Sequence, residues 1–545
     1  MRKKILSFAL LLVLLMPTFA LLSFSYAATE DEIEQSIIDG LAWLAGIQNL
    51  DGSWPGDEPV AKTGLAVLKF IDRAKELGEN PFSEEYEYNT TVYLGLEYIF
   101  LNAHKMNISA PQPHGDPDSD GDDWGVFFDS GNMWHRTYTT GICLMATGAA
   151  DACADKLGIP SPVVAFGPLA GQTYEDVIED TVDYLAFGQN DANWERGGWG
   201  YYENYGWSDN SNTGWVTLGL GYALASGATI PQFVYDELEV WINYIQNTGQ
   251  PDWNDPDPYG GSGYSAPDDW VNVLKTGNLL YQMALVGYPV DDLRVTDAVN
   301  YQERHWNYSD PDPGWKGGWL GHSHYQATFC IMKGFEAYGI KTISVGGGDL
   351  DWFDDIANLT IASQLGDGSW PSDYWGDEIL ATTWALLTLE RVVAILRIHV
   401  SIDIKPGSWP NPINKGSKGV ISVAICGTED IDVMTIDPGT MMLYNEISET
   451  GVAPLRWSYE DVATPFDDTT PDDPDGHEMT ADGFVDLVLK FDTQEVVGTL
   501  GLCGHEDWEY VKLFLKGNLF DEEGGTPIEG FDWVRIQSPK GKGKS

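Results

Sequence analysis

Residues 48–54 read Gln-Asn-Leu-Asp-Gly-Ser-Trp, and residues 364–370 read Gln-Leu-Gly-Asp-Gly-Ser-Trp. Each stretch is followed by Gly-Asp-Glu, at 56–58 and 376–378, and then at a matching distance by Thr63 or Thr383, which opens an apolar run. Two segments that share both a glycine–tryptophan turn and the run after it indicate an internal repeat.

More diverged copies of this unit fill the interval between the two stretches. A polar-faced segment, a glycine-containing turn and an apolar segment that begins near a threonine recur over residues 86–149, 174–228, 235–287 and 292–339. In the 86–149 copy a long acidic loop replaces the glutamine–tryptophan element. The sequence therefore predicts six helix pairs.

The two segments of each unit differ in pattern, and this difference predicts how they pack. The first is amphipathic, as at residues 33–44, where apolar side chains recur at helical spacing among acids. The second is almost wholly apolar, as at 213–223 and 382–389. Six outer and six inner helices can close into a ring, so we predict a mainly α fold over residues 30–395. The expected architecture is an (α/α)6 toroid with a central cavity.

The segment from Gly40 through Gln48 to Trp54 resembles the "QW" repeat of squalene–hopene cyclases. It equally resembles the glycine-rich repeats of protein prenyltransferase β subunits. The resemblance covers roughly residues 32–393 and implies an α/α toroid with a central cavity. Because one fold can host many functions, the chemistry has to be read from the residues themselves.

The N-terminal residues predict export. Three basic residues follow Met1, an apolar run covers residues 5–24, and Ser-Tyr-Ala ends at Ala27. This pattern is typical of a secretory signal over residues 1–27, with an uncleaved anchor as the alternative. No other segment is long and apolar enough to span a bilayer, so we expect a secreted, extracellular or cell-surface protein.

The charge balance narrows the range of partners. The chain has 30 basic and 83 acidic residues, and its formal net charge is −53. A nucleic-acid partner is not expected, because no basic surface is available to neutralise phosphate. The same charge disfavours anionic lipid and polyanionic glycans.

A second domain is predicted over residues 397–538. Residues 397–404 alternate between apolar and polar side chains, and further strand-like runs lie at 419–426, 486–491 and 510–516. These runs predict a β-sandwich that resembles accessory modules of secreted microbial proteins. The basic tail, residues 539–545, is expected to be disordered.

Five cysteines are too few for a disulfide scaffold. Cys143 and Cys330 fall within apolar inner helices, where buried thiols are expected. Cys426 and Cys503 both fall in the second domain, which leaves open whether they pair.

The cyclase resemblance implies a proton-donating Asp-X-Asp-Asp motif just before the threonine of an inner helix. The segment from Asp209 to Thr213 keeps the first acid, but Ser211 stands at the donor position. The corresponding residues of the other copies are not acidic either: Ala61, Tyr138, Leu274, Gln326 and Ala381. Proton-initiated cyclisation is therefore not expected, although an active isoprenoid cyclase or transferase stays as an alternative.

The prenyltransferase resemblance implies a zinc ion held by Asp, Cys and His. Asp151 and Cys153 have the Asp-X-Cys spacing but lack the aromatic helix that should follow, so zinc is not expected. One acidic loop does have calcium-loop spacing, with oxygen ligands at alternate positions and a glycine at the turn. Its predicted ligands to a structural calcium ion are Asp116, Asp118, Asp120 and Asp122. A solvated acidic loop is the alternative.

Aromatic, basic and acidic residues precede the inner helices and should converge at one end of the ring. The predicted ligand-binding residues are Trp134, Arg136, Trp207, Trp270, His322, His324 and Trp375. The candidate catalytic acids are Asp209, Asp57, Glu58, Asp377 and Glu378, and ring closure would bring the last four together. The sequence thus predicts a protein that binds an apolar or sugar-like small molecule or glycan. Carbohydrate processing by paired carboxylates is a further alternative.

Overall fold

The computed structural model describes most of the chain after residue 27. The described residues are 28–109, 112–119, 121–288, 290, 292–308, 313–317, 321–373, 376–392, 398–428, 431–445, 451–466, 474, 476–520 and 527–538. The predicted signal, the basic tail, Asp120 and Trp375 lie outside these residues.

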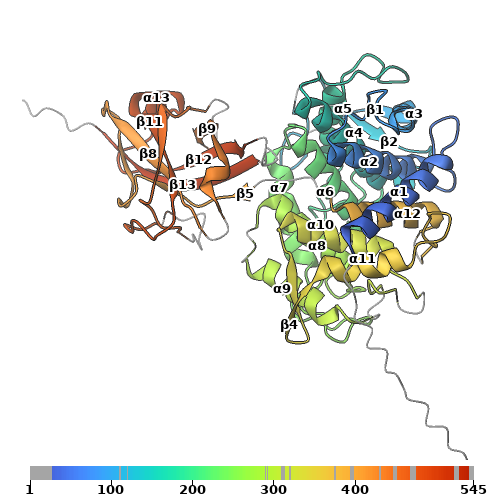
Figure 1. Cartoon of the computed structure of the whole chain (residues 1–545). Coiled ribbons are helices and arrows are strands. Elements are labelled where there is room, and N and C mark those ends of the chain that lie inside the picture. The colour runs from blue at the N-terminus through green and yellow to red at the C-terminus, as the bar shows by residue number, and fades with distance from the viewer. Residues whose placement is uncertain are drawn as a thin grey trace, which may run out of the picture.

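The first three-quarters of the chain is mainly α, as predicted (Figure 1). One set of helices, here called outer, comprises α1 (Glu30–Gly46), α3 (Asn89–Leu101), α5 (Tyr174–Gly188), α7 (Gln232–Ile245), α9 (Leu293–His305) and α11 (Trp352–Ala362). The other set, here called inner, comprises α2 (Pro59–Leu77), α4 (Arg136–Lys156), α6 (Asn210–Ala225), α8 (Val273–Val286), α10 (Tyr325–Ala337) and α12 (Glu378–Glu390). The inner helices are buried along most of their length, in keeping with their apolar sequences.

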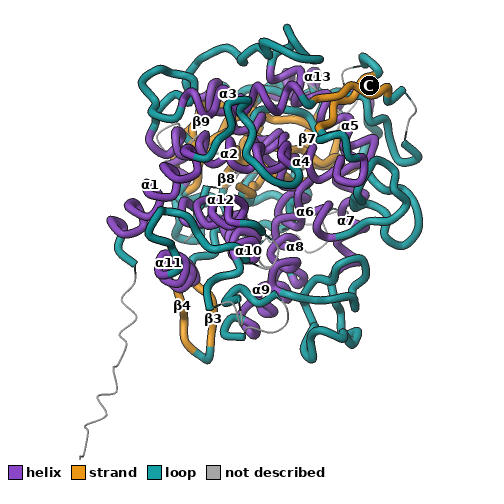
Figure 2. The backbone as a smooth tube through the Cα atoms, turned by 90° about the vertical axis from the view of Figure 1, so that its right-hand side faces the viewer, coloured by secondary structure: helices purple, strands orange, loops and turns teal. Residues whose placement is uncertain are grey.

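The inner helices contact one another in a closed order. Each packs against the next, from α2 through α4, α6, α8 and α10 to α12, and α12 packs in turn against α2. The first outer helix, α1, contacts both α11 and α12. In Figure 2 the outer helices lie toward the rim and the inner helices toward the middle.

A glutamine at the end of four outer helices joins each unit to the next. Gln48 Nε2 donates to the carbonyl of Gly52 in its own turn and to that of Thr91 on the following outer helix, both at 3.0 Å. The same pair of bonds is made by Gln189 to Gly197 and Val234, by Gln246 to Gly260 and Arg294, and by Gln364 to Gly368 and Ser36. The last of these joins the final turn to the first helix.

The turn glycine in each of these joints lies against the next outer helix. Gly52, Gly197, Gly260 and Gly368 all have φ between +81° and +97°. A Cβ on any of them would lie within 2.3 Å of a carbonyl oxygen of that helix. Both the left-handed backbone and the close approach require glycine at these positions.

Tryptophans fill three of these joints. Trp54, Trp199 and Trp370 are fully buried, and each ring N–H donates to a carbonyl of the preceding outer helix. Their backbone N–H groups donate to the hydroxyls of Thr63, Thr213 and Thr382 at the start of the inner helices.

Two details of the repeats differ from expectation. Thr382, rather than Thr383, corresponds to Thr63; counting back from it places Leu380 at the donor position, which is still not an acid. The acidic stretch of the second unit is not wholly loop, because β1 (Ala103–Asn107) and β2 (Trp124–Phe128) form an antiparallel hairpin. Phe128 N donates to Thr140 Oγ1 at 3.0 Å, so a phenylalanine takes the tryptophan position.

Side chains bridge the middle of the helical part, where the sequence predicts a central cavity. Trp215 of α6 stacks on Phe329 of α10, with ring centroids 5.8 Å apart. Nearer the C-terminal ends of the same helices, Lys333 Nζ donates to Tyr222 Oη at 3.0 Å. At these two levels, side chains of α6 and α10 meet across the interior.

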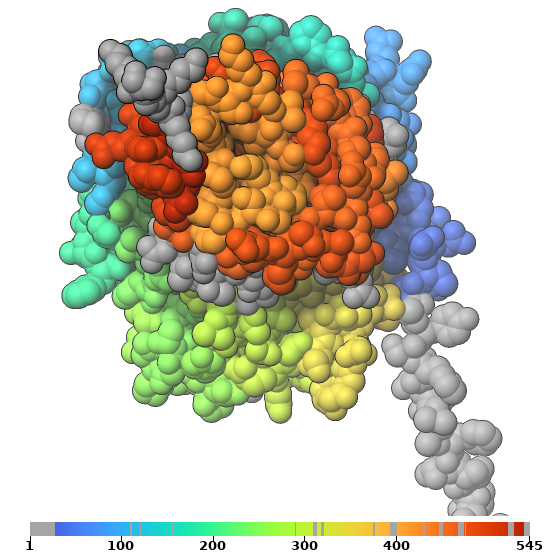
Figure 3. Space-filling model, turned by 90° about the vertical axis from the view of Figure 1, so that its left-hand side faces the viewer, coloured from blue at the N-terminus to red at the C-terminus, as the bar shows by residue number. Residues whose placement is uncertain are grey.

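The strand domain, residues 398–538, consists of two sheets that share an apolar core. One sheet has the order β10 (Arg456–Glu460), β11 (Asp486–Asp492), β8 (Val420–Ile425), β6 (Ile402–Ile404). The other has the order β5 (Ile398–His399), β13 (Pro527–Gln537), β12 (Tyr510–Leu519), β9 (Ile436–Asn445), with β7 (Pro412–Asn414) paired to β13. In Figure 3 this domain, orange and red, lies in front of the helical part.

A short hairpin and a short helix lie beside these larger elements. β3 (Thr342–Val345) and β4 (Gly348–Asp351) form a hairpin before α11, and α13 (Thr493–Thr499) follows β11.

The thiols of Cys143 and Cys330 are buried in α4 and α10, and burial raises the pKa of each. Cys426 and Cys503 are both free thiols, so they do not pair.

Candidate ligand-binding face

A row of aromatic side chains lies where α4, α6 and α8 begin, and we call it the aromatic strip. Its members are Trp134, Tyr201, Tyr202, Tyr205, Trp207, Tyr264 and Trp270. Neighbouring ring centroids within it lie 4.6 to 6.4 Å apart. Trp134 is 51% exposed and the other six are partly buried, so the strip presents apolar ring surface to solvent.

Local structure fixes these rings. Asn132 Oδ1 accepts the backbone N–H of Trp134 at 3.2 Å, which caps a short 3-10 helix before α4. The turn that carries the tyrosines bends at Gly206, whose φ is +87°. The hydroxyls of Tyr201 and Tyr264 are 3.1 Å apart, which connects the α6 side of the strip to the α8 side.

An arginine and a glutamate form the polar edge of the strip. Arg136 Nη1 donates to both carboxylate oxygens of Glu203, at 2.8 and 3.1 Å, and Arg136 Nε lies 3.3 Å from Asp129 Oδ2. Tyr184 Oη donates to Glu203 at 2.8 Å. Glu203 follows Tyr202 in the chain, and Arg136 and Tyr184 fix its carboxylate.

A lysine covers the other end of the strip. Lys275 Nζ lies 4.0 Å from the ring centroid of Trp270 and 5.9 Å from that of Tyr264. A cation over an aromatic face is attracted by the ring quadrupole. Lys275 thus covers the Trp270 end of the strip, whereas Arg136 at the start of α4 lies over Phe127, 4.1 Å from that ring centroid.

Three of the four acids of the first and last units are engaged by partners of their own. Asp377 forms an ion pair with Lys62, which confirms that these two units meet. Glu58, however, pairs with His135, and Glu378 accepts from Ser369 Oγ at 2.9 Å. Asp57 is exposed. Glu58, Asp377 and Glu378 thus each have a partner of their own, and the convergence of the four carboxylates stays a prediction.

Asp209 acts as a helix cap. It is fully buried, its Oδ1 accepts from Ser211 Oγ and Asn212 N, and its Oδ2 accepts from Asn212 Nδ2. Burial raises the pKa of this carboxyl, while the hydrogen bonds from Ser211 and Asn212 oppose the shift. With both oxygens engaged at the start of α6, Asp209 stabilises that helix end.

The two histidines lie at the start of α10, apart from the strip contacts. His324 caps the helix, its Nδ1 accepting from Ala327 N at 3.4 Å, and lies 3.6 Å from Asp373 Oδ2. The ring of His322 stacks on Tyr325 at 5.4 Å. Of the predicted ligand-binding residues, the strip therefore unites Trp134, Trp207 and Trp270, with Arg136 at its edge.

The predicted calcium loop lies between β1 and β2. Asp118 accepts backbone N–H groups of Gly121 and Asp123 on its two oxygens, at 2.8 and 3.0 Å. Asp116 and Asp122 each accept a backbone N–H two residues further on. Within the described residues, no group of three or more His, Cys, Asp or Glu side chains is arranged to hold a metal ion. The described carboxylates of this loop form Asx turns, and calcium binding stays a prediction.

Sequence reasoning missed part of the strip. Tyr201, Tyr202, Tyr264 and the edge carboxylate Glu203 were not among the expected site residues. The sequence does show a high local density of aromatic residues here. Residues 201–207 include four aromatics in seven positions, within a turn where apolar side chains have no helix face to occupy.

Comparison with known proteins gives little further guidance. No protein-family model matches the chain, and no curated protein matches its sequence. Among solved structures it is similar to a glycoside hydrolase family 15 glucoamylase from Hypocrea jecorina. That similarity has 11% sequence identity and a TM-score of 0.36, and it covers 94% of this chain and 100% of the other. In the part of the chain that the structure describes, no helix has the length and apolar character needed to cross a bilayer. The function must therefore be argued from the side chains.

Proposed function

We propose that this is an exported protein whose six helix pairs form an α/α toroid and whose aromatic strip binds a neutral carbohydrate chain. The closed order of inner-helix contacts and the repeated glutamine joints support the toroid. The N-terminal signal pattern supports export, to the medium or the cell surface.

The observation that carries the ligand class is the strip itself. Sugar rings have apolar C–H faces and a rim of hydroxyls, so they suit a surface of aromatic faces bordered by fixed polar groups. Here a row of rings begins at Trp134 and ends at Trp270, with Glu203 and Arg136 along one edge. A row of this kind accommodates several sugar units better than one compact ligand.

The charge of the protein favours a neutral carbohydrate chain as the ligand. At a net charge of −53 the protein would repel a polyanionic glycan, and the strip has acidic groups at its edge. An isoprenoid ligand is less well supported, because Trp215 and Phe329 bridge the middle of the inner helices. Isoprenoid cyclisation is less well supported still, because Asp209 is engaged as a helix cap.

Binding is proposed rather than cleavage. Glycoside hydrolysis requires two carboxyl groups across the scissile bond, one of them able to donate a proton. Glu203, Glu58 and Asp377 are each engaged by a basic side chain of another element, so none of the three stands ready as the acid of such a pair.

The test is titration of the full chain with neutral oligosaccharides built from glucose, xylose or mannose, followed by intrinsic tryptophan fluorescence. We expect one of these series to bind, with affinity rising with chain length. Trp134→Ala and Trp207→Ala should weaken binding at least about tenfold, since a lost stacking ring costs on the order of 1.4 kcal/mol. Trp457→Ala is the matched control, because Trp457 is 49% exposed but lies on β10 of the strand domain.

Two outcomes would count against the proposal. One is the absence of binding by all three series at millimolar concentration. The other is binding that Trp457→Ala weakens as much as Trp134→Ala does. Release of reducing ends during the titration, lost in Glu203→Gln, would instead favour carbohydrate processing over binding.

A further inference from the structure

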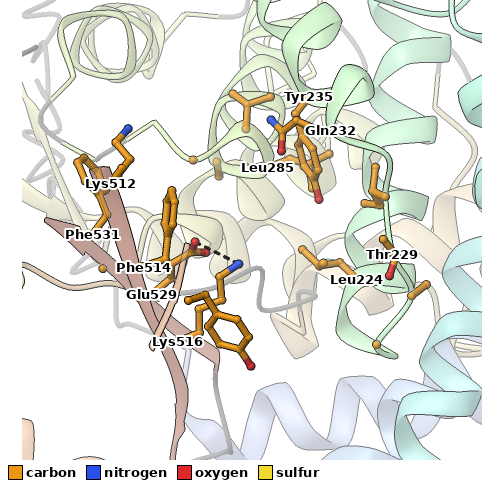
Figure 4. Close-up of a pocket in the computed structure, with 18 of the residues that line it drawn as sticks. Leu224, Thr229, Gln232, Tyr235, Leu285, Lys512, Phe514, Lys516, Glu529 and Phe531 are labelled. Carbon is orange, nitrogen blue, oxygen red and sulfur yellow. Dashed lines mark ion pairs between the residues drawn. The ribbon is translucent and has the colours of Figure 1, made fainter. Parts of the chain in front are cut away.

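A second candidate site lies between the helical part and the strand domain, away from the aromatic strip. It is a cleft of about 1330 Å³ between the ends of α6 and α8, the start of α7, and one face of the sheet that contains β9, β12 and β13. Figure 4 shows side chains of the sheet and of the helices facing each other across it. The aromatic strip lies at the N-terminal ends of the inner helices, whereas this cleft lies at the C-terminal ends of two of them.

The sheet side of the cleft is an ordered aromatic surface. Side chains alternate along β12, so that Leu513 and Leu515 are buried in the core while Phe514 faces outward. The strand register places Phe514 opposite Phe531 on β13 and opposite Tyr444 on β9. These three rings form one row across three adjacent strands, as cross-strand pairs do.

Two lysines flank this row on the same strand. Lys512 Nζ lies 4.3 Å from the ring centroid of Phe531, and Lys516 Nζ lies 5.8 Å from that of Phe514. Lys516 also forms an ion pair with Glu529 at 3.4 Å. Among the described residues no carboxylate lies within ion-pair distance of Lys512.

The charge of this cleft is opposite to that of the protein. Among the residues that the structure describes, its charged lining side chains are two lysines and one glutamate, in a chain whose formal net charge is −53. The facing wall is largely uncharged and apolar, with Leu224, Ile230 and Leu285 among its residues. The cleft thus offers apolar surface on both sides and a local excess of positive charge.

We propose that this cleft binds an amphiphilic anion, a small molecule with an apolar or aromatic body and one carboxylate or sulfonate group. The body would lie against Phe514 and Phe531, and the anionic group would lie near Lys512. Charge complementarity supports this choice. A neutral ligand would gain no electrostatic attraction from the two lysines, and a cation would be attracted more strongly to the acidic surface elsewhere on the protein.

The test uses two fluorescent probes of similar shape and different charge with the full chain. One is the anion 8-anilinonaphthalene-1-sulfonate, and the other is the uncharged N-phenyl-1-naphthylamine. We expect the double variant Lys512→Gln/Lys516→Gln to weaken the anionic probe about tenfold and to change the neutral probe less than twofold. Phe514→Ala should weaken both probes, and Lys418→Gln, an exposed lysine of the same domain, should change neither.

Circular dichroism and the urea midpoint of each variant show whether it is folded. In folded variants, equal loss of both probes in the double lysine variant would overturn the proposal, because the lysines would then not select charge. A loss of anionic probe binding in Trp134→Ala, with none in Phe514→Ala, would also overturn it by placing the probe on the aromatic strip.

Discussion

Gln364 and Ser36 are 328 positions apart and hydrogen-bond to each other twice. Ser36 Oγ donates to Gln364 Oε1 at 2.7 Å, and Gln364 Nε2 donates to the carbonyl of Ser36 at 2.9 Å. Gln48 makes the second of these bonds to the carbonyl of Thr91, only one unit further along the chain. The last unit therefore contacts the first as any unit contacts the next.

This relationship predicts the effect of Gln364→Ala. Removing the amide leaves two carbonyls without their donor, which typically costs about 1–3 kcal/mol at a partly buried site. The free energy of unfolding, measured in urea, should fall by this amount in Gln364→Ala and by a similar amount in Gln48→Ala. Gln35→Ala, an exposed control on α1, should change it by less than about 0.5 kcal/mol. A destabilised Gln48→Ala beside an unaffected Gln364→Ala would mean that the ring is open at this joint.

The close packing of α4 against α6 gives a second prediction. A Cβ on Gly141 would lie 2.6 Å from the carbonyl oxygen of Trp215, so Gly141→Ala should push the two helices apart and cost about 1–3 kcal/mol. Gly46, at the exposed end of α1, has open space where a Cβ would stand, with no atom within 4 Å. Gly46→Ala should be neutral or stabilising by up to about 1 kcal/mol, because alanine favours the helix. Urea denaturation of both variants measures these two changes in the free energy of unfolding, which should differ in sign or size. Equal destabilisation of the two variants would contradict the proposed packing.

Lys333 predicts a pH dependence of stability. Burial lowers its pKa to about 8, whereas an unfolded lysine has a pKa of about 10.4. Between these values the unfolded chain binds more protons at this site, so its contribution to stability rises with pH. From pH 8 to pH 10 wild-type protein should gain about 2 kcal/mol relative to Lys333→Met, in which this titration is absent. Parallel stability curves for the two proteins over this range would show that Lys333 titrates normally.

Calcium binding by the loop between β1 and β2 stays a prediction of the sequence alone. If the ion binds, saturating calcium should stabilise the fold by about 2–3 kcal/mol relative to chelator, since it binds only the folded loop. Asp118→Asn should abolish the difference, and Asp349→Asn, in the β3–β4 hairpin, should leave it intact. Thermal unfolding in calcium and in chelator makes the measurement. Identical midpoints would favour the solvated loop held by its own Asx turns.

The repeat joints could be predicted because each depends on short-range pattern. Gln48, Gln189, Gln246 and Gln364 each bond to the carbonyl of a positive-φ glycine, 4 to 14 residues later, and to a carbonyl of the next outer helix. In three of these four units a buried tryptophan lies two residues after that glycine. The exceptions have a physical cause as well. Three extra residues separate Trp370 from its threonine, which moves the partner to Thr382, and a hairpin substitutes Phe128 for the tryptophan.

The site could be predicted only in outline. Position in the repeat places a side chain at one end of the ring, but the direction of that side chain depends on partners from other units. Glu58 pairs with His135 and Asp377 with Lys62, and no local sequence pattern predicts either partner. Conversely, the strip depends on the pairing of Tyr201 with Tyr264, residues from two units that no local pattern connects.

The most direct test of the central claim is a crystal structure of the protein grown with the neutral oligosaccharide that binds best in solution. We predict sugar rings ordered along the aromatic strip, stacked on Trp134 and Trp207, with hydroxyls hydrogen-bonded to Glu203. Sugar ordered elsewhere on the protein, with no sugar on the aromatic strip at a saturating concentration, would contradict the proposal that the strip binds carbohydrate.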